Sequence, residues 1–199
     1  TFFARPLHEI EDFSEKYARE IGLPLYAQGS PSSISEPKLL PLLDAGLCFV
    51  EFGIQTAHEP TKRIYNRSDP NERILETAQL LRKHRRRLLP PRYHLILDCP
   101  WEPREGVMQT LDLMLRIPGP YQLSIGSLTF FPGTALHDRA KNEGLVKDEF
   151  RDIYRKPINW AKGTYPNILV VATGCVLIPR WMIRALSARP FLRLLDRRS

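Results

Sequence analysis

The fold is decided by an apolar stretch, Leu47-Cys48-Phe49-Val50-Glu51-Phe52-Gly53, whose residue types favour a β-strand. A helix is predicted just before it, opening at Ser35-Glu36-Pro37 and stopping at Gly46, with proline at the start and glycine after the end. Another helix is predicted after it, because Asp69-Pro70-Asn71-Glu72 supplies an N-cap, a proline and an N3 glutamate. A strand flanked by helices in this way indicates a sheet built from βα units.

The same alternation runs along residues 1–145. Further strands are predicted at 23–28, 93–97 and 121–131, and further helices at 8–21, 104–117 and 135–143. No hairpin signal separates the strands, so the sheet is expected to be parallel. Because a closed barrel needs eight βα units and about 250 residues, the chain is an incomplete barrel, an open parallel sheet or a fragment that lacks its first units. Of these we expect an α/β fold with a partial (β/α) TIM-like barrel of about four units.

The chain is expected to have two parts. Residues 1–145 form the partial barrel, and residues 146–199 form a mostly helical C-terminal extension. The abrupt start at Thr1-Phe2-Phe3, which resembles the end of a strand, favours a fragment of a larger barrel.

Composition supports a soluble globular domain, with 43% hydrophobic and 26% charged residues among 199. The longest apolar run, Asn167 to Pro179, is interrupted and falls short of the roughly 20 residues that a membrane span needs. No signal peptide is visible. The cysteines, Cys48, Cys99 and Cys175, are odd in number and far apart, which predicts a cytoplasmic location and no disulfide framework.

The net charge of +7 is concentrated locally. The run Arg82-Lys83-His84-Arg85-Arg86-Arg87 allows an RNA-binding interpretation, but it lacks aromatic residues and lies where cations favour a helix end, so a solvated helix end is favoured. Residues 180–199 alternate arginines with apolar residues and allow binding to an anionic membrane surface. Packing on another part of the protein is favoured, because Pro190 interrupts the stripe. The tail residues concerned are Arg180, Trp181, Met182, Arg184, Leu186, Arg189, Phe191, Arg193, Leu194 and Leu195.

Functional residues are expected at the carboxyl ends of the strands, as in other parallel βα sheets. The sequences there are Gln28-Gly29-Ser30-Pro31, Gly53-Ile54-Gln55-Thr56, Asp98-Cys99-Pro100-Trp101-Glu102 and Phe131-Pro132-Gly133-Thr134. Each combines a small or turn-forming residue with a polar side chain. That composition suits a polar ligand approached closely by the backbone, although turns use the same residues for structural reasons.

Taken in order, these phrases resemble the radical S-adenosylmethionine enzymes, in particular the cobalamin-domain subgroup of anaerobic magnesium-protoporphyrin monomethyl ester cyclase-like proteins. The resemblance covers roughly residues 1–145 and matches the later two-thirds of the family's six-unit partial barrel. The phrases that carry it are Ile21-Gly22-Leu23-Pro24, Leu43-Asp44-Ala45-Gly46, Glu51-Phe52-Gly53-Ile54-Gln55-Thr56, Tyr65-Asn66-Arg67, Ile96-Leu97-Asp98-Cys99-Pro100-Trp101-Glu102 and Phe130-Phe131-Pro132-Gly133-Thr134-Ala135-Leu136.

The resemblance implies S-adenosylmethionine and a [4Fe–4S] cluster as cofactors, and cobalamin as a further one. In the family, the reduced cluster donates an electron to S-adenosylmethionine, and the resulting 5′-deoxyadenosyl radical abstracts a hydrogen atom from the substrate. Three cysteines in a C-x-x-x-C-x-x-C loop bind the cluster, and this chain has no such loop. We therefore expect no metal ligand here, and we expect the cluster unit and any cobalamin domain in an N-terminal part of the full-length protein.

Five positions are implied as cofactor contacts. Gln28 matches a position that faces the methionine part of the cofactor, and Gln55 with Arg67 matches a pair that binds its ribose or carboxylate. His94 stands where related enzymes have an aspartate, and Asp98 where glycine is usual, so both depart from the pattern. The structural alternatives are that Arg67 pairs with Asp69 or Glu72, that Gln28 caps the loop at Ser30, and that Asp98 caps its turn. Glu102 is expected to cap the helix at 103–117.

The full-length protein is thus expected to be a radical S-adenosylmethionine iron–sulfur oxidoreductase or methyltransferase-like enzyme with a small-molecule substrate, and the isolated chain is expected to be inactive. Two alternatives stay open at this point. One is an RNA-modifying, methylthiotransferase-like radical enzyme, and the other is a catalytically inert binding or scaffold module.

Overall fold

A four-stranded parallel sheet forms the centre of the computed structural model, which describes residues 2–188 and 191. Its strands are β1 (Leu25–Gly29), β2 (Leu47–Gln55), β3 (Arg92–Leu97) and β4 (Gln122–Ser127). They lie side by side in the order β1-β2-β3-β4, so each strand pairs with the one that follows it in the chain. The predicted parallel βα sheet is confirmed.

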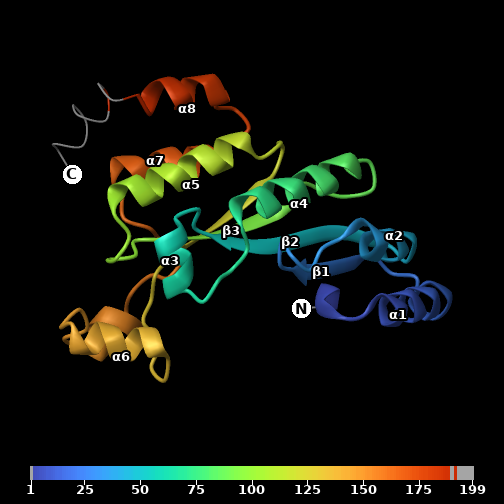
Figure 1. Cartoon of the computed structure of the whole chain (residues 1–199), viewed down its shortest axis with the longest axis horizontal. Coiled ribbons are helices and arrows are strands. Elements are labelled where there is room, and N and C mark those ends of the chain that lie inside the picture. The colour runs from blue at the N-terminus through green and yellow to red at the C-terminus, as the bar shows by residue number, and fades with distance from the viewer. Residues whose placement is uncertain (1, 189–190, 192–199) are drawn as a thin grey trace.

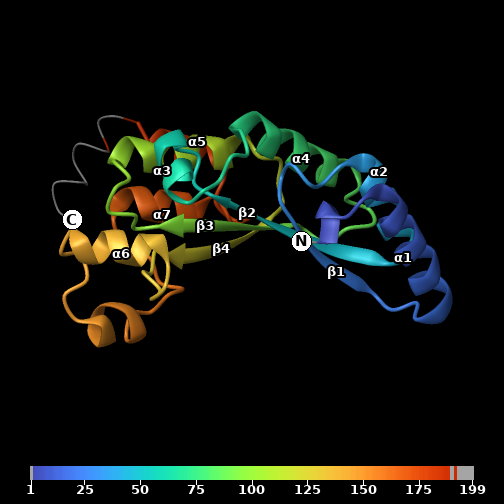
Figure 2. The same ribbon diagram turned by 60° about the horizontal axis from the view of Figure 1, so that its bottom comes forward.

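The helices that connect the strands run along one face of this sheet (Figure 1 and Figure 2). They are α2 (Glu36–Asp44), α4 (Asn71–Lys83) and α5 (Arg104–Arg116), and α1 (Leu7–Glu20) packs against α2. Parallel strands in sequential order with right-handed crossovers place every connection on the same side. The sheet therefore has a helix-covered face and an open face, which is the arrangement of a partial barrel.

The core lies between the sheet and these helices. Alternate residues of β2 and β3 point toward the helices, and Val50, Phe52, Tyr93 and Leu95 are each at most 2% exposed. Helix residues pack against them, and these include Leu39, Leu42, Ile74, Ala78, Leu81, Leu111 and Met114. Glu51 of β2 and His94 of β3 alternate with these residues and lie on the open face, where Gln28 of β1 is paired with Glu51.

Two local features differ from the sequence-based expectation. A short helix, α3 (Glu59–Ile64), lies between β2 and α4 where none was predicted. Strand β4 ends at Ser127 rather than Phe131. It ends there because the Ser127 N–H donates to the carbonyl of Ile158, which belongs to the C-terminal extension, while the Thr129 hydroxyl turns back to the Ser127 carbonyl.

The C-terminal extension is helical, as expected, and contributes to the main core. After α6 (Ala135–Asn142) come a π-helical turn (Phe150–Tyr154), α7 (Tyr165–Ala172) and α8 (Arg180–Leu186). Helix α7 packs along α5 on the helix-covered side of the sheet (Figure 2). Leu169 and Val170 of α7 and Ile183 of α8 are buried in the core of the sheet.

Parts of the tail lie beyond this description. Arg189, Arg193, Leu194 and Leu195, on which the membrane-surface hypothesis partly rests, lie outside the described residues. Within residues 2–188 and 191, no helix is long and apolar enough to cross a bilayer. The division of the chain at residues 145 and 146 stays a prediction.

A buried lysine holds α3 in place. The Lys62 side chain is 2% exposed, and its ammonium donates to Glu59 Oε1 at 2.8 Å, to the Asp69 carbonyl at 2.9 Å and to Asn71 Oδ1 at 2.6 Å. The Asn71 amide in turn donates to the Ala57 carbonyl at 2.9 Å. All three ammonium protons therefore have acceptors, and together they join α3 to the start of α4.

Replacing this lysine should destabilise the fold. Lys62→Ala removes a buried side chain and leaves the half-buried Asp69 carbonyl and Asn71 amide oxygen without their donor, and we expect the free energy of unfolding to fall by about 1–3 kcal/mol. Urea denaturation followed by circular dichroism measures this change. Lys83→Ala is the control, because it removes only an exposed ion pair with Glu36 and should change the transition much less. Equal losses in the two variants would contradict the role given to Lys62.

Candidate ligand site at the carboxyl ends of the strands

A cavity of about 330 Å³ opens at the carboxyl ends of β2, β3 and β4. Polar groups come from Gln55, Tyr65 and Arg67, and apolar walls come from Ile96 and from Ile158 of the extension. The remaining lining residues follow β4 or end it, and they are Gly126, Ser127, Leu128, Thr129, Phe131, Thr134 and Leu136. Two of the five predicted site residues, Gln55 and Arg67, thus share one cavity.

Gln55 lines this cavity from an uncommon backbone conformation. It is the last residue of β2 and has a φ of 60°, at a register irregularity that follows Gly53. A Cβ atom on Gly53 would overlap the Gln55 amide, so the side chain folds back over this glycine. The Gln55 Oε1 atom is buried and has no hydrogen-bond partner within the described residues. Such an acceptor is costly to leave unsatisfied, and a ligand hydroxyl or ammonium would satisfy it.

Arg67 reaches the cavity from the loop after α3. Its backbone N–H donates to the Lys62 carbonyl at 2.9 Å, and the preceding Asn66 has a φ of 52°. Its guanidinium is exposed and forms no ion pair with any described residue. The suggested pairing with Asp69 is absent, because the Asp69 carboxylate instead accepts from the Ser32 backbone and hydroxyl. Arg67 therefore keeps its five donors for an external anion.

A second polar cluster lies on the open face, deeper in the sheet, and is centred on Glu51. The Glu51 side chain is 6% exposed. One carboxylate oxygen accepts from the Tyr26 hydroxyl and the Gln28 amide, and the other lies 3.4 Å from Arg92 Nη1. Burial raises the pKa of Glu51, but the hydrogen bonds from Tyr26 and Gln28 and the neighbouring His94 outweigh it, so the pKa lies below its ordinary value.

This cluster brings together two more predicted residues. Gln28 does not cap the loop at Ser30, where Ser33 makes the local hydrogen bonds, but donates to Glu51. His94 lies beside it, with Nε2 at 3.4 Å from Glu51 Oε2 and without hydrogen-bond geometry. Sequence reasoning did not single out Glu51, although a glutamate in the middle of an apolar strand was the available signal.

Asp98 occupies a different environment. It follows β3 with a φ of 62°, and its carboxylate accepts from the Ser127 hydroxyl at 2.7 Å, the Lys162 N–H at 2.9 Å and the Asn167 amide at 2.9 Å. These bonds join the ends of β3 and β4 to the C-terminal extension. The structure therefore shows a structural role for this carboxylate, and its contact with a cofactor stays a prediction.

Glu102 does not cap α5. The N-cap residue is Pro103, and no side-chain hydrogen bond is made there. Glu102 instead accepts from the Thr56 hydroxyl at 2.5 Å, which ties the end of β2 to the start of α5. Burial raises the pKa of Glu102, and the hydroxyls of Thr56 and Thr61 offset this only in part.

The cysteines do not fit an iron–sulfur cluster. Cys48 donates to the Leu25 carbonyl, Cys99 is buried after β3 with its pKa raised by burial, and Cys175 is exposed after α7. Among the described residues, no group of three cysteine, histidine or acidic side chains is placed to hold a metal ion. A [4Fe–4S] cluster needs such a set of thiolates, and these residues do not supply one.

Solved structures share this architecture. Elp3 of the archaeon Methanocaldococcus infernus, with its N-terminal residues 1–46 deleted, superposes with a TM-score of 0.59 at 18% identity, over 91% of this chain and 44% of its own. The radical S-adenosylmethionine methyltransferase TsrM of Kitasatospora setae, bound to tryptophan and an S-adenosylmethionine analogue, superposes with a TM-score of 0.53 at 20% identity. This chain shares its fold with both.

The match with TsrM covers 69% of this chain and 26% of that enzyme. A second structure of TsrM, with cobalamin and a [4Fe–4S] cluster bound, gives the same TM-score of 0.53. The chain thus spans less than half the length of each of these three solved structures. No family model and no curated protein sequence matches it.

The raised pKa of Glu102 predicts a pH dependence. The folded state binds this proton more tightly than the unfolded state, so ionisation above the ordinary pKa of 4.5 lowers the free energy of unfolding. Glu102→Gln keeps an acceptor for Thr56 but cannot ionise. We expect its free energy of unfolding, relative to the parent, to increase as the pH rises through and above this value.

Chemical denaturation at a series of pH values measures the difference between Glu102→Gln and the parent. Thr56→Val should steepen the pH dependence of the parent, because it removes a hydrogen bond that favours the ionised carboxylate. A difference between Glu102→Gln and the parent that stays constant with pH would contradict the assignment.

Proposed function

We propose that this chain is part of a radical S-adenosylmethionine enzyme and that it supplies contacts to S-adenosylmethionine from the carboxyl ends of its strands. The observation that carries the proposal is the cavity at these ends. It combines the amide oxygen of Gln55 with the guanidinium of Arg67, and neither group has a partner within residues 2–188 and 191. The fold shared with TsrM supports it, because that enzyme has an S-adenosylmethionine analogue bound.

The chemistry of the two side chains suits this ligand. A guanidinium binds a carboxylate with two parallel hydrogen bonds, so Arg67 would take the carboxylate of the methionine moiety. The Gln55 oxygen would accept a hydrogen bond from the ammonium group or a ribose hydroxyl. Ile96 and Ile158 offer apolar contact to the adenine ring. When bound, S-adenosylmethionine would supply an activated methyl group or, given one electron from the cluster of the full-length protein, a 5′-deoxyadenosyl radical with release of methionine.

The open face beside this cavity would receive the substrate. Gln28, Glu51 and His94 lie on it and offer both donors and acceptors to a small polar molecule. The ligands of the [4Fe–4S] cluster would come from another part of the full-length protein, because the cysteines of this chain do not fit one. Membership of the cobalamin-dependent, cyclase-like subgroup and a cytoplasmic location are further parts of this proposal.

Binding of S-adenosylmethionine by the chain tests the proposal. Nuclear magnetic resonance detects weak binding at millimolar ligand, and we expect shifts of backbone amide signals at the ends of β2 and β3 and in the loop that carries Arg67. The double variant Gln55→Ala/Arg67→Ala should weaken binding by about tenfold or more, because it removes a charge-assisted pair and a buried acceptor.

Arg63→Ala is the matched control. Arg63 is exposed on α3 and does not line the cavity, so its removal changes the charge by the same amount and should leave binding unchanged. Shifts that persist in the double variant would place the ligand elsewhere. No detectable binding at millimolar ligand would favour the alternative of an inert binding or scaffold module.

A further inference from the structure

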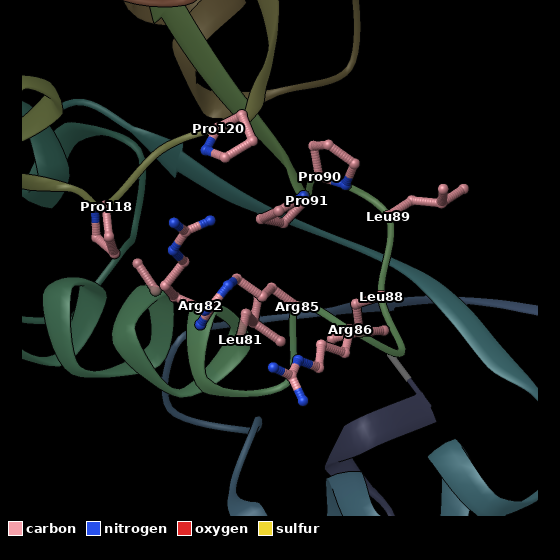
Figure 3. A pocket seen from close by; sticks show the side chains of 11 residues that line it. Leu81, Arg82, Arg85, Arg86, Leu88, Leu89, Pro90, Pro91, Pro118 and Pro120 are labelled. Carbon is pink, nitrogen blue, oxygen red and sulfur yellow. The ribbon is translucent and has the colours of Figure 1, made fainter.

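A second hollow lies at the opposite ends of the strands, where β3 and β4 begin. Its volume is about 260 Å³, and it lies between the end of α4 and the segments that lead into the two strands. Arg82, Arg85 and Arg86 come from α4 and the residues after it, and two proline pairs face them from the strand entries (Figure 3). The cavity that we assign to S-adenosylmethionine shares no residue with it.

The basic run at residues 82–87, at the end of α4 and just after it, contains cations with an acidic partner and cations without one among the described residues. Lys83 and His84 contact Glu36 at 2.6 and 3.1 Å, and Arg87 contacts Asp44 at 2.8 Å. Arg82, Arg85 and Arg86 form no ion pair with any residue of 2–188 or 191. The cations that line the hollow are therefore the ones without an acidic partner, and no acidic residue lines the hollow with them.

The rest of the hollow is apolar. Leu81 and Leu88 are buried beneath it, and Leu89 is 57% exposed at its edge. The prolines before β3 and β4 present ring surfaces and have no N–H group, so their backbone offers no donor to an incoming strand. A ligand with both anionic and aliphatic groups would match this surface, because its anions would face the arginines and its aliphatic groups would face the leucines and prolines.

The size and composition favour a polypeptide as the ligand. Pockets that enclose a drug-sized molecule measure about 300–1,000 Å³, so this hollow is better suited to one or two side chains of a longer segment. None of the residues that line it is aromatic. RNA-binding surfaces generally stack bases on aromatic side chains, so the hollow lacks the feature that would hold a nucleobase.

We propose that this hollow is a docking site for an acidic segment of a partner polypeptide. Carboxylates of the segment pair with Arg82 and Arg85, and an adjacent aliphatic side chain enters between Leu81, Leu88 and the prolines. The site is independent of S-adenosylmethionine binding, since it uses the amino ends of the strands and the ligand cavity uses their carboxyl ends.

Fluorescence anisotropy with the full chain tests this proposal. The probe is a labelled synthetic peptide that alternates glutamate and leucine. We expect saturable binding that weakens as salt is added, and Arg82→Gln/Arg85→Gln should weaken it by at least about tenfold. Lys147→Gln/Arg155→Gln is the control, because it removes the same charge from exposed residues outside the hollow and should leave binding unchanged.

Two further peptides separate charge from apolar contact. A peptide that alternates glutamine and leucine and one that alternates glutamate and serine should each bind much more weakly than the probe. If the glutamate–serine peptide bound as tightly as the probe, the proposed contact of an aliphatic side chain with the leucines and prolines would be wrong. Absence of probe binding, or equal binding by both double variants, would overturn the proposal. Displacement of the probe by polyuridylate, through the same arginines, would assign the hollow to RNA instead.

Discussion

Sequential strand order is the constraint on which the rest of this structure depends. Because each parallel strand pairs with the next one, every connecting helix returns on the same side, and the opposite face receives none of them. The covered face can be built from Val50, Phe52, Tyr93 and Leu95, while the uncovered face must be polar or have a ligand over it. The hydrogen-bonded group around Glu51 meets this requirement with partners from the two neighbouring strands, β1 and β3.

The same uncommon backbone conformation occurs at the ends of β2 and β3, with different consequences. Gln55 and Asp98 both have a positive φ without being glycine, a conformation that is uncommon and concentrated at functional positions. At Gln55 it leaves a buried amide oxygen that has no hydrogen-bond partner among the described residues. At Asp98 it aims a carboxylate at three donors of the chain itself, which join the strand end to the C-terminal extension.

Most elements of the fold could be predicted from the sequence, because the hydrophobic period and the capping residues of helices and strands are local signals. Helix α3 was missed, since its six residues are too few to show a period. The site was harder to foresee. A sequence shows that Gln28 and Glu51 lie in strands, but not that the strands pair in register, and it gives no sign that the partners of Asp98 lie 29, 64 and 69 residues away.

The bonds that Asp98 makes to the extension have a consequence for the order of folding. Ile158 forms part of the wall of the cavity at the carboxyl ends of the strands, and its carbonyl accepts the hydrogen bond that ends β4. Contacts between residues so far apart in sequence require the closure of a long loop, and they form later than the local turns and helices. During synthesis, β1, β2 and β3 can therefore pair while the cavity is still unfinished. The cavity is completed only when the segment around residues 158–167 has emerged and docked.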